Sequence, residues 1–163
     1  MKNGSFVIFT VGHGAKSIDE FINLLEAYEI QRVVDVRTVP GSRHNPQFNK
    51  EILPKSLKKF HIGYIHIKGL GGLRHAKKDS VNTAWRNASF RGFADYMQTE
   101  NFRRSLKRLI KLAKQKKVAI MCAESVPWRC HRSLIADALQ VWGMQVKHVM
   151  SQRSCADHKM TPW

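Results

Sequence analysis

Five short runs of apolar residues recur along the chain. They lack the alternation of polar and apolar positions that a strand with one solvent-exposed face would show. Such runs are typical of parallel strands that helices cover on both faces. We therefore predict buried strands over Phe6–Val11, Arg32–Val36, Gly63–Ile67, Val118–Cys122 and Val146–Val149.

Segments with helical periodicity lie between these runs. Ser17 is a favourable helix N-cap with Glu20 at the capping-box position, and apolar residues then follow the spacing of one helix face up to Tyr28. Gly143 is a typical helix stop for the last helical segment. The further predicted helices are Glu51–Phe60, Gly92–Met97, Phe102–Lys114 and His131–Trp142.

The alternation of strands and helices predicts the fold class. We expect an α/β protein, a three-layer sandwich with a mostly parallel, Rossmann-like sheet of about five strands. No repeat or low-complexity linker divides the chain, so residues 1–150 are expected to form a single α/β domain and residues 151–163 a loosely docked C-terminal tail. Two long connections, Arg37–Asn49 and Lys68–Arg91, are expected to be functional or mobile.

The carboxyl ends of the predicted strands bring reactive side chains to one edge of the sheet, where proteins of this class bind ligands. Asp35 and Glu124 are the candidate catalytic carboxylates, and His13 and His131 are the candidate proton donors. The polar residues at these ends are His13 after the first strand, Asp35 and Arg37 after the second, His66 and Lys68 after the third, and Cys122 and Glu124 after the fourth.

The strong positive charge of the chain predicts the kind of partner that the protein binds. The 163 residues contain 28 Lys and Arg against 12 Asp and Glu, a formal net charge of +16. Such a surplus costs self-repulsion and favours a polyanion, because each neutralised phosphate releases a counterion. The segment Phe102–Lys117 carries many of these cations and no acid, which indicates either a phosphate-binding stripe or an ordinary solvated helix face. The candidate phosphate-binding residues are Arg37, Arg43, His44, Lys68, Arg104, Lys107, Arg108, Lys111, Arg129 and Arg132, and Lys77 lies in the same basic surroundings.

The densest motif runs from Met121 to Ser133 and contains two cysteines. Cys130 stands near a predicted helix N-terminus beside His131, which favours a lowered thiol pKa. Cys122 or Cys130 is therefore a possible nucleophile, although a small buried thiol is the plainer interpretation. Arg129 follows Cys122 by seven positions, which excludes the Cys-x5-Arg loop of tyrosine phosphatases.

Other spacings exclude further classes of protein. Gly12–Ser17 lacks the contiguous Gly-Lys-Ser of a nucleotide P-loop, so a nucleoside triphosphatase is excluded. No Cys-x2-Cys pair is present, and we expect neither a metal nor a cofactor. Three cysteines are too few for a disulfide framework, and no apolar run approaches the roughly 18 residues of a membrane span. We expect a cytoplasmic protein without a membrane partner.

The motifs together resemble the family known as domain of unknown function 488. The resemblance extends over residues 6–150, and it implies an α/β domain whose motif residues line one pocket. Relatives are associated with the excision of damaged purines from DNA, such as hypoxanthine and alkyladenine. Family members usually carry Ser after Gly-His, where this chain has Gly14. The resemblance is carried by Gly12-His13, Val34-Asp35-Val36-Arg37 with Pro40 and Ser42, Phe48-Asn49-Lys50, Leu70-Gly71-Gly72, Gly92–Met97, Met121–Glu124 and Pro127–Arg132.

Our leading hypothesis is a nucleic-acid enzyme, with DNA favoured, that removes damaged purine bases as a DNA repair N-glycosylase. Such a reaction needs a carboxylate, a proton donor and aromatic side chains that stack on an extruded base. Phe48, Tyr64 and Trp128 are the stacking candidates. A cysteine-dependent small-molecule transferase or hydrolase and a non-catalytic nucleic-acid binding module remain open as alternatives. The lesion, the choice between DNA and RNA, and the oligomeric state stay open.

Overall fold

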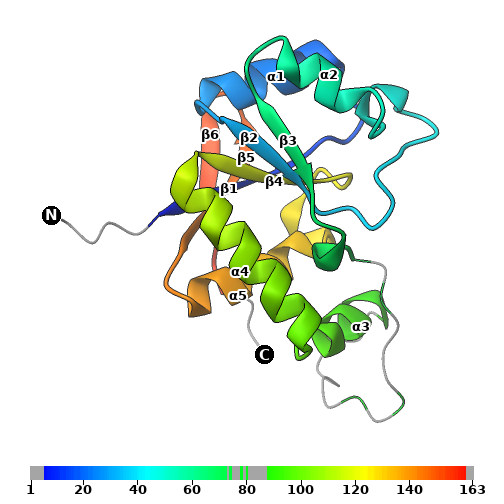
Figure 1. The fold of residues 1–163 in the computed structure, drawn as a ribbon, viewed down its shortest axis with the longest axis vertical. Coiled ribbons are helices and arrows are strands. Elements are labelled where there is room, and N and C mark those ends of the chain that lie inside the picture. Colours follow the sequence, from blue (N-terminus) through cyan, green and yellow to red (C-terminus); the bar gives the residue numbers. More distant parts are fainter. Residues whose placement is uncertain (1–5, 73, 75–77, 79, 81–87, 161–163) are drawn as a thin grey trace, which may run out of the picture.

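A mixed six-stranded sheet forms the centre of the protein (Figure 1). The computed structural model describes residues 6–72, 74, 78, 80 and 88–160. The strand order is β3-β2-β4-β1-β5-β6; the first five strands are parallel and β6 is antiparallel to β5. The strands are β1 (Val7–Gly12), β2 (Arg32–Asp35), β3 (Gly63–His66), β4 (Val118–Cys122), β5 (Gln145–Ser151) and β6 (Ser154–Asp157).

Helices cover the sheet on both sides, so the predicted three-layer α/β sandwich is confirmed. α1 (Ile18–Ala27) and α2 (Leu53–Lys58) lie on one face, and α3 (Ala88–Tyr96), α4 (Glu100–Gln115) and α5 (Arg132–Val141) lie on the other (Figure 1). Each interface has its own cluster of buried apolar side chains. Three single 3₁₀ turns interrupt the connections: η1 (Pro46–Phe48), η2 (Lys68–Leu70) and η3 (Pro127–Arg129).

Local sequence signals account for the helices. Ser17 and Glu20 form the predicted capping box at the start of α1. Gly143 ends α5 with a φ of 86°, a left-handed conformation that glycine adopts without strain. The segment predicted as a helix over Glu51–Phe60 is helical only over Leu53–Lys58.

The amphipathic pattern of α4 is present as predicted. Its buried side, which includes Phe102 and Leu106, packs in the cluster beneath the sheet. Its exposed side carries Arg103, Arg104, Lys107, Arg108 and Lys111. Glu100 lies just before the basic segment Phe102–Lys117 and forms ion pairs with Arg103 and Arg104. Two cations of the exposed side therefore have an acidic partner.

The sixth strand was not predicted. Ser154–Asp157 is short and fully exposed, so it carries none of the apolar pattern by which a strand is recognised. Its position depends instead on backbone pairing with β5 and on the residue that follows it, the buried His158. The Nε2 of His158 lies 2.6 Å from Asp137 Oδ1, and its Nδ1 lies 2.8 Å from His148 Nε2. The segment expected to be a loose tail therefore reaches the core through a hydrogen-bonded chain.

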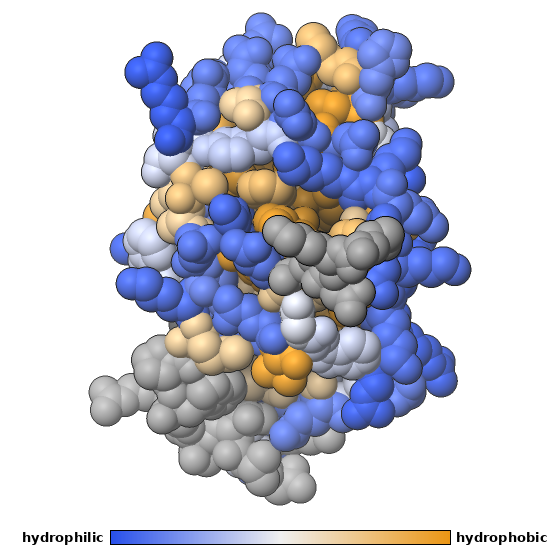
Figure 2. Space-filling view, turned by 90° about the vertical axis from the view of Figure 1, so that its left-hand side faces the viewer, coloured by the Kyte–Doolittle hydropathy of each residue, from blue (hydrophilic) through white to orange (hydrophobic). Residues whose placement is uncertain are grey.

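The surface is predominantly polar. The face at the left of Figure 1 is hydrophilic over most of its area, with apolar residues gathered around a hollow near its middle (Figure 2). In the described part of the chain, none of the helices combines the length and the apolar character that crossing a bilayer requires.

The topology creates a crevice at the carboxyl ends of β1 and β4. These strands are neighbours, with Gly12 opposite Cys122. β1 leads into α1 on one face of the sheet, whereas β4 leads into α5 on the other. Such a switch point is where open α/β sheets bind their ligands.

The neutral state of His148 predicts a pH dependence of stability. Burial, followed by the positive influence of His158 and Arg132, lowers the pKa of His148 to about 4 from its ordinary 6.5. The unfolded chain therefore takes up this proton at higher pH than the folded chain does, and the free energy of unfolding falls as the pH drops from 6.5 to 4. We expect this residue to contribute about 3 kcal/mol to the fall.

Urea denaturation at several pH values tests this prediction. The variant His148→Gln, although less stable at neutral pH, should lose less stability between pH 6.5 and 4 than the natural protein. The exposed His44→Gln is the matched control and should follow the natural profile. Parallel profiles for all three proteins would contradict a neutral buried His148.

Candidate active site

A cavity of about 330 Å³ lies at the predicted edge of the sheet. It is formed by the loops that follow β2 and β4, by residues after η2 and by the start of α3. This volume is at the lower end of the range for small-molecule sites. The lining residues are Arg37, Thr38, Val39, Gly41, Gly72, Phe90, Cys122, Ala123, Glu124, Arg129, Cys130 and His131.

A fully buried guanidinium lies beneath the loop after β4. Arg132, the first residue of α5, has no exposed surface. Its Nη1 donates to the carbonyl of Glu124 at 2.8 Å and to the Sγ of Cys122 at 3.1 Å, and its Nη2 donates to the carbonyl of Ser125 at 3.0 Å. A Cβ on Gly12 would overlap the Glu124 carbonyl oxygen and crowd Arg132, so only glycine fits there. Arg132 therefore anchors the loop. We predicted that it binds external phosphates, but its buried guanidinium is not available to them.

Two thiols meet at the floor of the cavity. The Sγ atoms of Cys122 and Cys130 lie 2.6 Å apart, and both cysteines are buried. Burial raises the pKa of Cys122, but the hydrogen bond from Cys130 and the charge of Arg132 outweigh it, so that the net shift is downward. The hydrogen bond to Cys122 and burial raise the pKa of Cys130. Within the pair, Cys122 is therefore the thiol whose surroundings favour the thiolate.

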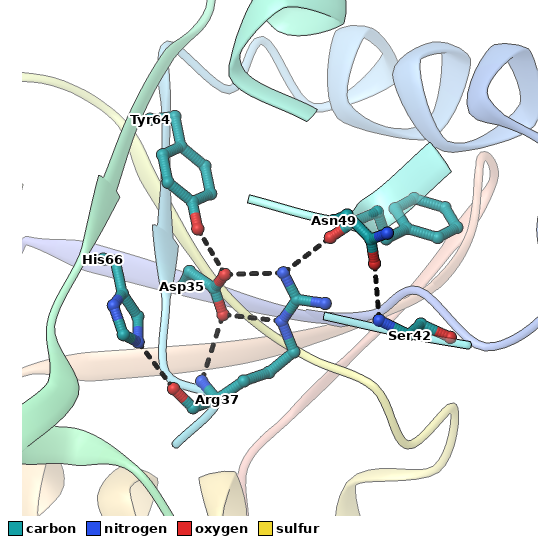
Figure 3. Close-up of polar contacts among 7 residues, drawn as sticks. Asp35, Arg37, Ser42, Asn49, Tyr64 and His66 are labelled. Carbon is teal, nitrogen blue, oxygen red and sulfur yellow. Dashed lines mark hydrogen bonds and ion pairs between the residues drawn. The ribbon is translucent and has the colours of Figure 1, made fainter. Parts of the chain in front are cut away.

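The carboxylate of Asp35 is committed to a buried ion pair (Figure 3). Arg37 Nε and Nη2 donate to its two oxygens at 2.9 and 2.7 Å, and the backbone N–H of Arg37 and the Tyr64 hydroxyl also donate to it. Asp35 has no exposed surface and does not line the cavity. Burial alone would lower the pKa of Arg37, but the hydrogen bonds and charge of Asp35 raise it. The geometry therefore gives Asp35 a positioning role toward Arg37.

Arg37 in turn fixes the loop that follows β2. Its Nη2 also donates to the carbonyl of Phe48 at 2.7 Å, and its own carbonyl accepts from His66 Nε2 at 2.7 Å (Figure 3). Asn49 Oδ1 accepts from the backbone N–H of Ser42 across the same loop. Although Arg37 lines the cavity, its guanidinium is thus engaged inward, and a direct phosphate contact is not its main role.

The two candidate proton donors are both neutral imidazoles. Burial lowers the pKa of His131 to about 4, and its Nε2–H donates to the carbonyl of Val36 at 2.8 Å. Its unprotonated Nδ1 therefore faces the Sγ of Cys130 at 3.4 Å. Burial also lowers the pKa of His13, which stacks on Phe48 outside the cavity lining. At neutral pH, His131 is placed to accept a proton from a thiol.

None of the three predicted stacking residues lines the cavity. Phe48 is fully buried against His13, and Tyr64 is hydrogen-bonded to Asp35, so neither offers a free ring face to a base in the cavity. Trp128 is 65% exposed and lines a second, mostly apolar cavity of about 420 Å³ beside β6. Phe90 lines both cavities and is the aromatic residue that sequence reasoning missed. No motif marks it, because its position depends on how α3 packs.

Cations line two shallow hollows near the cavity. One hollow shares Val39 and Gly41 with the cavity and contains Arg43 and Lys50. Another contains Lys68, Arg74 and Arg104. It adjoins the cavity at Gly71–Gly72, because Arg74 donates to the carbonyls of Gly71 and Lys68 at 3.2 and 3.3 Å. Lys77 lies outside the described residues.

The remaining predicted cations are exposed. His44 lies in the loop after β2, Arg129 at the cavity wall, and Lys107, Arg108 and Lys111 along α4. Within the described residues, no group of three or more His, Cys, Asp and Glu side chains is placed to hold a metal ion.

Because Asp35 balances the buried charge of Arg37, we expect a large loss of stability when a neutral residue replaces Asp35. Asp35→Asn leaves the Arg37 guanidinium buried without a counter-charge, and we expect the free energy of unfolding to fall by about 3–5 kcal/mol. Tyr64→Phe removes one hydrogen bond and should cost about 1 kcal/mol. Urea denaturation measures both. If the Asp35→Asn protein keeps its natural stability but loses its activity, the positioning role is contradicted. Asp35 would then have the catalytic role that the sequence predicted.

Comparison with known proteins identifies the family. The profile of domain of unknown function DUF488 matches residues 17–139, more than half of the chain. No curated protein and no solved structure matches the chain significantly. The match includes Asp35, Arg37, Cys122, Glu124 and the Cys130–Arg132 segment, the residues that build the cavity and its supports. The chain belongs to the DUF488 family.

Proposed function

We propose that the protein is a nucleic-acid-directed enzyme that removes a damaged purine base, as a DNA repair N-glycosylase. The observation that carries the proposal is a cavity with two cationic hollows near it. The backbone of a nucleic acid would contact Arg43 and Lys50 in one hollow and Lys68 and Arg104 in the other. One nucleotide would then enter the cavity.

The lining of the cavity supports chemistry on a base. Phe90 supplies an aromatic surface, and Arg129 and the backbone around Gly72 supply polar groups. An enzyme that acts on a base extrudes it from the stack and holds it in such a pocket. Phe90 lines the cavity, whereas Phe48 and Tyr64 do not, so Phe90 replaces them as the stacking candidate.

Glu124 is the carboxylate that would assist bond cleavage. It lines the cavity, its side chain is exposed, and its backbone carbonyl is fixed by Arg132. Rupture of an N-glycosidic bond develops positive charge on the sugar, and a carboxylate stabilises this charge or orients the attacking water. Asp35 lacks access to the cavity, so we assign the role to Glu124 alone.

Substitution of this carboxylate tests the chemistry. On duplexes that carry hypoxanthine, uracil or an alkylated adenine, the natural protein should release the base, and Glu124→Gln should slow release by about 10²-fold or more. Glu26→Gln, an exposed change on α1, is the control and should retain full activity. DNA binding without base release by the natural protein on all of these substrates would contradict base excision and favour the binding-module hypothesis.

The basic hollow predicts a specific salt dependence of affinity. Lys68→Gln combined with Arg104→Gln should weaken duplex binding and lower the slope of log affinity against log salt, by about 0.9 for each lost phosphate contact. Lys58→Gln combined with Lys59→Gln removes the same charge from exposed positions at the end of α2. Fluorescence anisotropy over a salt series compares them. Equal slopes for both double variants would show that only the overall charge matters.

A thiol-dependent transferase or hydrolase reaction is the second candidate. The contact between Cys122 and the buried Arg132 favours it, because a cation stabilises the thiolate that acts as nucleophile. Under this hypothesis Cys122→Ser abolishes activity, whereas under base excision Cys122→Ser retains base release and Glu124→Gln does not.

A further inference from the structure

Among the described residues, no carboxylate forms an ion pair with Arg132. A guanidinium stays protonated in proteins, and a buried charge is stable only when it is paired. Arg132 is completely buried, and no ion pair joins it to a carboxylate in the described part of the chain. Two of its partners are the neutral carbonyls of Glu124 and Ser125. The Sγ of Cys122, at 3.1 Å, is the partner that can carry a negative charge.

The second thiol lies in contact with the first. Cys130 Sγ is 2.6 Å from Cys122 Sγ and 3.4 Å from the unprotonated Nδ1 of His131. The backbone N–H of Arg132 also points to Cys130 Sγ at 3.5 Å. Cys130 thus has a sulfur within reach to attack, which is the first requirement of a resolving cysteine.

A small reagent can approach the pair. Cys122 and Cys130 both line the cavity of about 330 Å³, although they are only 2% and 6% exposed. A protein surface could not contact their sulfurs, whereas a low-molecular-weight compound in the cavity could. Inert structural cysteines lie in apolar surroundings away from solvent, whereas reactive ones lie in electropositive, accessible sites.

We propose that Cys122 and Cys130 form a redox-active dithiol that reduces small disulfides, with Cys122 as the attacking thiolate, Cys130 as the resolving thiol and Arg132 as the positioning residue. The inference goes beyond the proposed function and does not depend on it, because neither Glu124 nor the cationic hollows take part.

The reaction balances in two exchange steps. The thiolate of Cys122 attacks one sulfur of a disulfide R–S–S–R; a Cys122–SR bond forms, the S–S bond breaks, and RS⁻ leaves with the electron pair. Cys130 then attacks Cys122 Sγ and displaces the second sulfur group, which leaves with the Cys130 proton as RSH. The dithiol loses two electrons to R–S–S–R, and the products are the Cys122–Cys130 disulfide, RS⁻ and RSH.

Oxidation removes the counter-charge of Arg132. The disulfide is neutral, so the buried guanidinium loses the one anionic partner described above. We therefore expect the oxidised protein to be less stable than the reduced one, the reverse of the usual effect of a disulfide. Because the dithiol form is stabilised in this way, the Cys122–Cys130 disulfide is readily reduced again. The disulfide therefore persists only while oxidant is in excess.

Reaction with bis(2-hydroxyethyl) disulfide tests the proposal by intact mass and peptide mapping. The exposed Cys155 would react on its own, so every protein carries Cys155→Ser. This background protein should lose two hydrogen atoms and link Cys122 to Cys130. The further change Cys130→Ser should trap a mixed disulfide on Cys122, and Cys122→Ser should give neither product. Unreacted cysteines, or a mixed disulfide that Cys130 does not resolve, would overturn the proposal.

The charge of Arg132 is tested separately. In the same background, Arg132→Gln should slow the first exchange at pH 7 by about ten-fold or more, as expected for a thiol pKa one unit higher. Arg153→Gln, an exposed change between β5 and β6, is the matched control. The ultraviolet absorbance of the thiolate, followed against pH in the folded protein, gives a reading independent of the variants. Absence of a thiolate below pH 7 would overturn the role of Arg132. Base release by Glu124 is unaffected by any of these outcomes, so the two proposals fail separately.

Discussion

The buried guanidinium of Arg132 is the constraint on which the cavity depends. It starts α5, reaches beneath the end of β4, and holds the carbonyls of Glu124 and Ser125 as well as the sulfur of Cys122. The absence of a Cβ on Gly12 gives it the space to do so. Because a buried cation costs several kcal/mol unless it is paired, these partners must stay in place. The conformation of the loop after β4 follows from that requirement.

A second buried arginine fixes the opposite wall in the same way. Arg37 is held by both oxygens of Asp35 and ties the carbonyl of Phe48 to the end of β2. Two loops that would otherwise be flexible are thus each anchored by a guanidinium that faces inward. The charges of Arg37 and Arg132 serve the architecture of the site, whereas Arg43, Lys50, Lys68 and Arg104 face solvent.

The sequence predicted the sheet, the helices and the edge where reactive groups meet, because apolar periodicity is local and parallel strands end together. It placed Cys122 and Glu124 at that edge for the same reason. It did not reveal that Asp35, Arg37, Phe48 and Arg132 turn inward, since a polar residue at a strand end looks the same whether it faces solvent or another buried charge. Strand β6 was missed because its pairing depends on His158, whose partners are distant in the chain.

One side chain joins the two chemical groups of the cavity. Arg132 contacts both the sulfur of Cys122 and the backbone carbonyl of Glu124. Its charge favours a thiolate on Cys122, and its hydrogen bond fixes the backbone from which the Glu124 side chain extends. No ion pair joins the guanidinium to the Glu124 carboxylate itself, so the proposed exchange at the sulfurs and the proposed chemistry at Glu124 use different groups. One buried cation therefore supports two separate groups that line the same cavity.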